Sequence, residues 1–213
     1  MELIVAKSAG FCFGVKRAVE TVQSLVKNAD AETHIYTLGK LIHNPQITQE
    51  LSDAGVTVID CGSIADDIAA LHEIYRRTDA HHKSVIVTRT HGVVKQIEDT
   101  ILSYAAENTF FSVVDCTCPY VKKIHSIVSE YSLPGTLTVL IGDAHHPEVE
   151  GICSRARGDT LIVSNAQMLK ATKFDGRQVI LAAQTTQKLT EWKECQNFIR
   201  KVCTNPQIFD TIC

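Results

Sequence analysis

The sequence is organised around residues 9–20, AGFCFGVKRAVE, in which one cysteine lies in a turn with glycines on both sides. Gly10 and Gly14 allow the backbone to approach another group closely, because glycine has no β-carbon. The helix expected after Gly14 directs its N-terminal amides and the positive end of its dipole towards Cys12, which favours the thiolate. The segment is therefore typical of a ligand-bearing loop between an apolar strand, Leu3–Ala6, and an amphipathic helix.

Length, charge and cysteine content restrict the class of protein. The chain has 213 residues, a net charge of -3 and eight cysteines, which suits one large domain or two small ones. Without a general basic field we expect no nucleic acid, and an anionic ligand has to be held by local groups. We find no apolar run of membrane-helix length and no signal peptide, so we expect a cytoplasmic protein with no membrane partner. Because the cytoplasm is reducing, the eight cysteines indicate metal or redox chemistry rather than disulfides.

Short apolar strands alternate with helices along the whole chain, which predicts an α/β fold of parallel sheets covered by helices. We expect strands over His34–Leu38, Val56–Ile59, Lys83–Thr88, Phe110–Val114, Thr136–Ile141, Thr160–Val163, Gln178–Ala182 and Gln207–Asp210. We expect the longer helices over Val15–Val26, Ile64–Arg77, Val94–Ala106, Tyr120–Tyr131 and Leu189–Val202. Asn44 is the expected N-cap of a further helix that begins at Pro45 and ends at Gly55, and another short helix follows Pro147.

Loops that follow the strands recur in the same order, which indicates internal repeats. The segment that begins at Cys12 resembles the one that begins at Cys118. The recurring motifs are His43-Asn44-Pro45 with His145-His146-Pro147, Val85–His91 with Val179–Thr185, and Asp115-Cys116-Thr117-Cys118 with Asp210-Thr211-Ile212-Cys213. We therefore expect one unit over residues 1–108 and a second over 109–205, with residues 206–213 opening a truncated third unit that carries Cys213.

The three recurring cysteines are candidate metal ligands. In open parallel sheets, ligands bind beyond the carboxyl ends of the strands, and Cys12, Cys118 and Cys213 are all expected there. Three thiolates on an iron–sulfur cluster leave one iron open for a substrate. Thiolates also bind zinc; the spacing matches no zinc-finger pattern, so it favours iron only weakly. We expect the remaining cysteines to be ordinary buried residues or non-ligand neighbours: Cys61, Cys116, Cys153, Cys195 and Cys203.

Polar residues in the same loops are candidates for substrate binding and proton transfer. His43, His91 and His146 occupy strand-to-helix loops, where imidazoles can donate to phosphate or alkoxide oxygens. Glu148 is the carboxylate placed to deliver a proton, although an acidic residue at a helix start also compensates the helix dipole. Thr185 either hydrogen-bonds a substrate hydroxyl or caps the next helix. Jointly these loops predict a pocket for an anionic ligand.

Together the motifs resemble the family of 4-hydroxy-3-methylbut-2-enyl diphosphate reductases of the methylerythritol phosphate route to isoprenoids. The resemblance spans the whole chain and follows the family's order. It is carried by Gly10-Phe11-Cys12-Phe13-Gly14-Val15, His43-Asn44-Pro45-Gln46, Thr90-His91-Gly92-Val93, Thr117-Cys118-Pro119, His146-Pro147-Glu148-Val149-Glu150-Gly151, Gln184-Thr185-Thr186 and Asp210-Thr211-Ile212-Cys213.

The resemblance implies a three-domain, trefoil-like α/β protein around an iron–sulfur cluster of the 4Fe-4S type. Its ligands here would be Cys12, Cys118 and Cys213. The open iron would bind the substrate hydroxyl, which an electron pair and protons remove as water to give isopentenyl and dimethylallyl diphosphates. Such a family implies a ferredoxin or flavodoxin as the electron donor.

The resemblance also assigns roles to the polar residues. By position, Glu148 matches the family's proton donor and Thr185 its partner, while His43, His91 and His146 match the histidines around the diphosphate. The family continues beyond its third cysteine with a segment that completes the diphosphate site. We therefore expect this chain to be a fragment with an incomplete pocket and little or no turnover.

Two other functions remain open on the residues alone. One is a non-enzymatic metal-binding or regulatory module, for example with a structural zinc site. The other is a thiol oxidoreductase, although the sequence has no Cys-x-x-Cys pair.

Overall fold

The computed structural model describes residue 4, residues 9–174 and residues 176–213. The chain divides into two compact units. Unit 1 comprises Met1–Thr90 and Ile101–Cys118, and unit 2 comprises His91–Thr100 and Pro119–Cys213. The strand expected over Leu3–Ala6 lies outside the described residues, apart from Ile4, which has no regular secondary structure.

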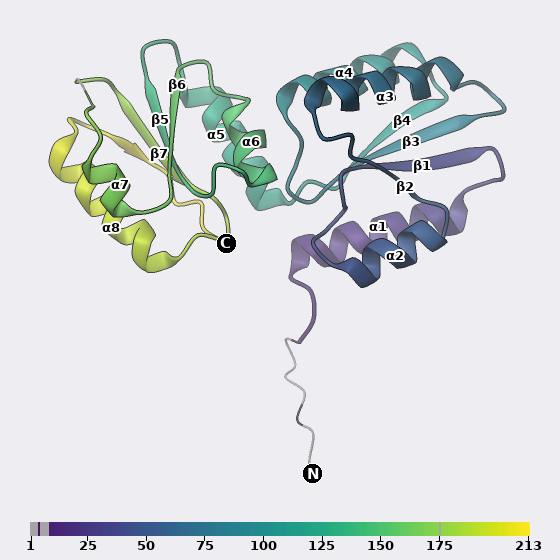
Figure 1. The fold of residues 1–213 in the computed structure, drawn as a ribbon, viewed down its shortest axis with the longest axis horizontal. Coiled ribbons are helices and arrows are strands. Elements are labelled where there is room, and N and C mark those ends of the chain that lie inside the picture. The colour runs from purple at the N-terminus through teal and green to yellow at the C-terminus, as the bar shows by residue number, and fades with distance from the viewer. Residues whose placement is uncertain (1–3, 5–8, 175) are drawn as a thin grey trace. The chain divides into compact units, whose positions relative to one another are not determined.

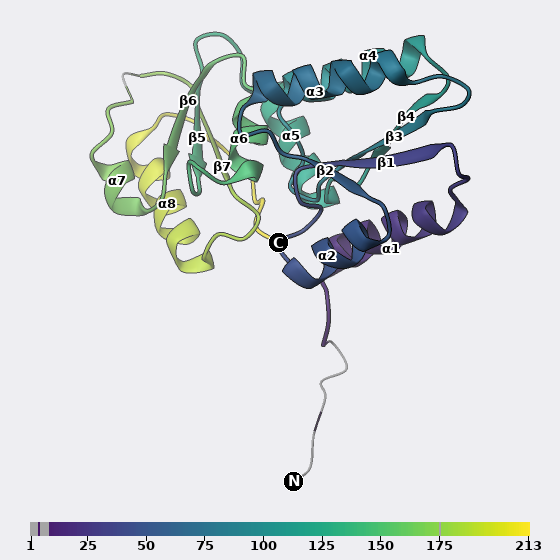
Figure 2. The same ribbon diagram turned by 45° about the vertical axis from the view of Figure 1, so that its right-hand side comes forward.

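Unit 1 contains a four-stranded parallel sheet in the order β2-β1-β3-β4. Its strands are β1 (Thr33–Leu38), β2 (Thr57–Ile59), β3 (Lys83–Thr88) and β4 (Phe111–Asp115). Helices α1 (Phe13–Asn28) and α2 (Pro45–Asp53) lie on one face, and α3 (Ile64–Arg77) and α4 (Lys95–Glu107) lie on the other (Figures 1 and 2). The division between the units passes through α4, whose residues up to Thr100 belong to unit 2.

The predicted helix signals of unit 1 act as expected. Asn44 caps α2, because its side-chain oxygen accepts a hydrogen bond from the Ile47 amide at 3.1 Å. Pro45 occupies the first turn, and Gly55 follows the helix with a φ of +89°, a conformation that favours glycine. Helix α1 buries Ala18 and the rest of one stripe against the sheet, as its apolar spacing predicts.

Unit 2 repeats the same architecture, with strand order β6-β5-β7-β8. Its strands are β5 (Leu137–Ile141), β6 (Asp159–Val163), β7 (Val179–Ala183) and β8 (Gln207–Ile208). Helices α5 (Pro119–Tyr131) and α6 (Pro147–Cys153) lie on one face, and α7 (Ala166–Lys170) and α8 (Leu189–Val202) lie on the other (Figure 1). Both β5 and β7 are buried along their whole length, which explains why all their residues except Thr138 are apolar.

The equal strand order of the two sheets confirms the α/β fold with repeated parallel-sheet units. Two strands, however, do not belong to the units in which we expected them. Strand β4, which we placed at the start of the second unit, pairs with β3 in the first sheet. Strand β8, which we placed in a third unit, pairs with β7 in the second sheet. Alternation along the chain predicts a strand but does not say which distant strand it pairs with.

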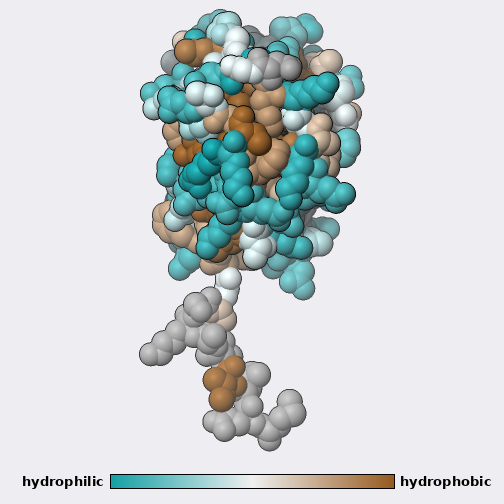
Figure 3. Space-filling model, turned by 90° about the vertical axis from the view of Figure 1, so that its left-hand side faces the viewer, coloured by the Kyte–Doolittle hydropathy of each residue, from teal (hydrophilic) through white to brown (hydrophobic). Residues whose placement is uncertain are grey.

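The helices in the described part of the chain pack on the faces of the two sheets. None of these helices is both long and apolar enough to cross a lipid bilayer. On the face shown in Figure 3, hydrophobic residues gather in the upper middle and are surrounded by hydrophilic ones.

Candidate active site

A buried carboxylate lies in the first turn of α6. Glu148 is 1% exposed, and its Oε1 accepts a hydrogen bond from the Thr185 amide at 2.6 Å. Its Oε2 accepts from the Thr185 hydroxyl at 2.8 Å. Burial raises the pKa of Glu148, while the two hydrogen bonds from Thr185 act in the opposite direction. The carboxyl group thus keeps its proton to higher pH than an ordinary glutamate, which suits a general acid.

Two predicted histidines lie together in unit 2. His146 is the N-cap of α6, and its Nδ1 accepts a hydrogen bond from the Glu148 amide at 3.1 Å. When Nδ1 of a neutral imidazole accepts, the proton is on Nε2, which is then a donor. The ring of His91 packs edge-on against that of His146, with centroids 5.1 Å apart and an interplanar angle of 85°. The pair therefore offers imidazole nitrogens beside the Glu148 helix turn.

The loop after β8 brings Cys213 to Thr185. The backbone of this loop continues the β7–β8 pairing. The Phe209 amide donates to the Leu181 carbonyl at 2.9 Å, and the Cys213 amide donates to the Thr185 carbonyl at 2.9 Å. Between them, the Thr211 hydroxyl replaces one backbone step of this ladder. The same residue that holds Glu148 thereby holds the backbone of Cys213.

The other two candidate thiols lie in unit 1. Cys12 is exposed and stands at the N-cap position of α1, where its side chain makes no capping hydrogen bond. Cys118 is half-buried, and its amide donates to the Thr90 carbonyl at 2.9 Å. A β-carbon placed on Gly14 would lie 2.7 Å from Cys118 Sγ. Glycine at this position therefore lets the first turn of α1, with its positive dipole end, approach the Cys118 thiol.

The third predicted histidine also lies in unit 1. His43 is exposed and precedes the N-cap residue of α2. It lines a pocket of about 310 Å³ whose other walls include Lys40, Asn44 and Thr48. Donor groups and a lysine therefore surround the imidazole at the start of this helix.

The remaining cysteines divide into buried and exposed residues. Cys116 and Cys195 lie in hydrophobic cores, and burial raises the pKa values of Cys153 and Cys195 to about 11, which makes both thiols poor ligands at neutral pH. Cys203 is half-buried, whereas Cys61 is exposed. Our expectation of burial was wrong for Cys61, because it lies in the loop after the edge strand β2. All eight cysteines lie in the described part of the chain, and none forms a disulfide.

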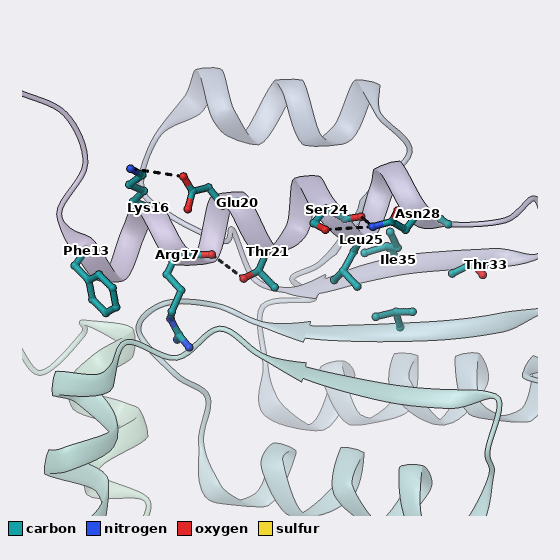
Figure 4. A pocket seen from close by; sticks show the side chains of 12 residues that line it. Phe13, Lys16, Arg17, Glu20, Thr21, Ser24, Leu25, Asn28, Thr33 and Ile35 are labelled. Atoms are coloured by element: carbon teal, nitrogen blue, oxygen red, sulfur yellow. Dashed lines mark hydrogen bonds and ion pairs between the residues drawn. The ribbon is translucent and has the colours of Figure 1, made fainter.

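A groove of about 730 Å³ runs along α1 but contains none of the predicted site residues. Figure 4 shows Arg17, Thr21 and Leu25 pointing from the helix towards the strands, whereas Lys16 and Glu20 point the other way. The Arg17 Nη2 donates to the carbonyl of Thr117 at 2.7 Å. Through this hydrogen bond Arg17, which lines the groove, holds the loop that leads to Cys118.

Sequence reasoning missed two groups of contacts around the site. In the sequence Thr211 stands out only as part of a recurring motif, and no local pattern predicts the hydrogen bonds between its hydroxyl group and Ala183. Arg155 and Glu98 carried no motif, yet they form an ion pair in which the Arg155 side chain is 4% exposed. Both cases depend on residues that are distant in the sequence.

The fold and the site first define a class. This is an α/β protein in which Cys118, Cys213 and the buried acid Glu148 follow the carboxyl ends of parallel strands, the edge where open parallel sheets bind their ligands. The LytB protein family matches residues 3–213, and the chain belongs to this family.

Known relatives place the chain among reductases. It is 35% identical over 213 residues to the 4-hydroxy-3-methylbut-2-enyl diphosphate reductase of Thermoanaerobacter sp. (strain X514), covering all of this chain and 67% of the relative. It is 36% identical over 216 residues to the reductase of the same name from Geobacter metallireducens, again covering 67% of that protein. The expected enzyme class, an oxidoreductase, is thus confirmed.

Solved structures agree with the sequence relatives. The structure of an (E)-4-hydroxy-3-methyl-but-2-enyl diphosphate reductase, described as the terminal enzyme of the non-mevalonate pathway, matches with a TM-score of 0.73 and 30% identity. The match covers 99% of this chain and 68% of that one. A Plasmodium falciparum E-1-hydroxy-2-methyl-but-2-enyl-4-diphosphate reductase matches with the same TM-score, 0.73, and 25% identity, covering 97% of this chain and 59% of that one.

Proposed function

We propose that this chain carries the acid and three cluster ligands of a 4-hydroxy-3-methylbut-2-enyl diphosphate reductase. The reaction would break the carbon–oxygen bond of the substrate's hydroxyl group, consume an electron pair and protons, and release water with isopentenyl or dimethylallyl diphosphate. The observation that carries the proposal is the contact of Thr185 with both Glu148 and Cys213. It joins a proton donor to a candidate cluster ligand within unit 2. Since the chain spans about two thirds of its relatives' length, turnover is proposed for the whole protein.

The residues present fit an iron–sulfur cluster of the 4Fe-4S type. Cys12 and Cys213 are exposed thiols, and Cys118 lies against Gly14, where any β-carbon would collide with its sulfur. Thiolates are the ligands that such clusters use. We propose these three cysteines as the ligands. When bound, a cluster with one open iron would supply electrons and a Lewis acid.

The proposed proton donor is Glu148. Burial raises the pKa of Glu148 and so favours the protonated carboxyl group, and proton transfer to the departing hydroxyl group turns a poor leaving group into water. Thr185 holds both carboxylate oxygens, so it orients the acid. Its hydroxyl group is also the proposed contact of the substrate hydroxyl.

The proposed diphosphate ligands are His43, His91 and His146. The Nε2 proton assigned to His146 makes its ring a donor suited to phosphate oxygens. The chain's net charge of -3 supplies no general attraction for an anion, so such local donors are needed. We propose a low-potential ferredoxin or flavodoxin as the electron donor.

Anaerobic purification tests the proposal. We expect brown protein that contains iron and acid-labile sulfide, and we expect both to fall when Cys12, Cys118 or Cys213 is replaced by serine. Colourless protein with stoichiometric zinc would instead indicate a metal-binding module without reductase chemistry.

The acid is tested separately in the complete protein. Glu148→Gln should leave the iron and sulfide content unchanged and suppress dehydroxylation by about 100-fold or more, the usual contribution of a general acid. Unchanged turnover would remove Glu148 from the mechanism.

A further inference from the structure

A buried arginine of unit 2 has no role in the chemistry proposed so far. Arg155 follows α6, and its side chain is 4% exposed. Its Nη1 donates to the carbonyls of Val93 and Gly151 at 2.9 and 2.6 Å, and its Nη2 donates to Glu98 Oε2 at 2.7 Å. A guanidinium removed from water is costly unless its charge and donors are matched. Here one carboxylate and two carbonyls match it.

These contacts join two segments that are distant in the sequence. Val93 and Glu98 lie in the stretch His91–Thr100, whereas Gly151 lies on α6. A β-carbon on Gly151 would be 3.3 Å from the Val93 carbonyl oxygen, so the two backbones approach closely. The stretch His91–Thr100 belongs to unit 2 although the chain on either side of it belongs to unit 1. The Arg155 contacts explain why residues His91–Thr100 pack with unit 2.

A neighbouring serine strengthens the same junction. The Lys95 amide, at the start of α4, donates to Ser154 Oγ at 2.8 Å. The Ser154 hydroxyl in turn donates to the Gly151 carbonyl at 2.7 Å. The first amide of α4 is therefore capped by a side chain from the end of α6, which fixes the helix start against it.

Each of the two joined segments carries one histidine of the imidazole pair. His91 opens the stretch that Arg155 holds, and His146 caps the helix that carries Gly151. We infer that Arg155 is a positioning residue that holds His91 edge-on against His146 and so forms the imidazole pair before any ligand binds. That the ligand is a diphosphate rests on the proposed function; the positioning itself rests on the Arg155 contacts. A methionine could fill the same volume, but it would leave Glu98 and the Val93 carbonyl without the donors that Arg155 supplies, and the Gly151 carbonyl would keep only its bond from Ser154.

The test uses the 213-residue chain without ligand, labelled with ¹³C at its histidines. In the unaltered chain we expect a nuclear Overhauser cross-peak between the rings of His91 and His146, assigned with single His→Gln variants. Arg155→Met should abolish this cross-peak. Arg157→Met is the matched control, because Arg157 is exposed and makes its contact with the Ser129 carbonyl. A cross-peak retained in Arg155→Met overturns the inference.

Folding is checked in the same samples. Trp192, the single tryptophan, is 1% exposed in the core of unit 2, so its fluorescence reports whether that unit is folded. If the Arg155→Met chain is not folded, the Arg155→Lys chain is used for the test instead. A lysine keeps the charge, but one ammonium cannot reproduce the planar fork of donors, so the cross-peak should weaken. An unchanged cross-peak in a folded Arg155→Lys chain overturns the inference.

Inorganic diphosphate provides the second measurement. We expect Arg155→Met to weaken its binding about tenfold or more, by analogy with the roughly 10–100-fold effect of residues that orient metal ligands, and Arg157→Met to leave it unchanged. Equal binding by the Arg155→Met and unaltered chains contradicts the inference. If the cross-peaks behave as expected but no chain binds diphosphate, the positioning role stands, and the proposed role of His43, His91 and His146 as sufficient diphosphate ligands in this chain is wrong.

Discussion

At the scale of single residues, the site depends on a carboxyl group whose chemistry is changed by burial. Glu148 is held by Thr185 and almost fully removed from water. Its pKa is raised above that of an exposed glutamate, about 4.3 in the unfolded chain. Between these two pKa values the folded state binds more protons than the unfolded state. The free energy of unfolding therefore falls as pH rises through this window.

Glu148→Gln should remove this part of the pH dependence. We expect the free energy of unfolding of unit 2 in the unaltered chain to decrease from about pH 4.3 up to the raised pKa, and the decrease to be smaller in the variant. The free energy of unfolding is measured by urea unfolding, followed by Trp192 fluorescence, at a series of pH values. Glu150→Gln, an exposed change on the same helix, is the control and should keep the slope. Equal slopes in all three chains would contradict the prediction.

At the scale of elements, local signals determine helices and strands well. The residues of α3 and β3 agree with the sequence prediction at both ends, because their caps and apolar spacing are local. The ladder that extends β7–β8 is different. Thr211 Oγ accepts from the Ala183 amide at 2.9 Å and donates to the Ala183 carbonyl at 2.7 Å. A hydroxyl group thus completes a strand pairing that leads to Cys213.

Thr211→Val should loosen the loop that carries Cys213. Valine has a similar shape but leaves the Ala183 amide and carbonyl unpaired in a buried position, which costs about 1–3 kcal/mol. Hydrogen exchange measured by NMR should be faster at the Cys213 amide in this variant. Thr211→Ser keeps the hydroxyl group and should retain most of the protection. Equal exchange in the valine and unaltered chains would show that Thr211 does not hold the loop.

At the scale of the whole molecule, each unit has its own sheet and its own hydrophobic core. Leu51 of α2 packs in a core that belongs to unit 1, and Trp192 of α8 packs in one that belongs to unit 2. Chains with separate cores often depart from two-state unfolding. A change in one core is then expected to act mainly on its own unit.

Leu51→Ala should separate the unfolding of the two units. Truncating a buried leucine costs about 2–5 kcal/mol, so the far-ultraviolet circular dichroism should show an earlier urea transition. The Trp192 fluorescence transition should stay where it is in the unaltered chain. A shift of both transitions by the same amount would mean that the two cores unfold as one block.

The sequence by itself determined the helices and strands, the α2 cap at Asn44 and the order of the loops that carry the predicted site residues. These features follow from apolar periodicity, turn chemistry and motif order, which act over short stretches of chain. Only the tertiary structure decided that β4 and β8 close the first and second sheets, and that Arg155 reaches Glu98. Such pairings depend on backbone and side-chain donors that meet across long separations, and a local pattern carries no information about the partner.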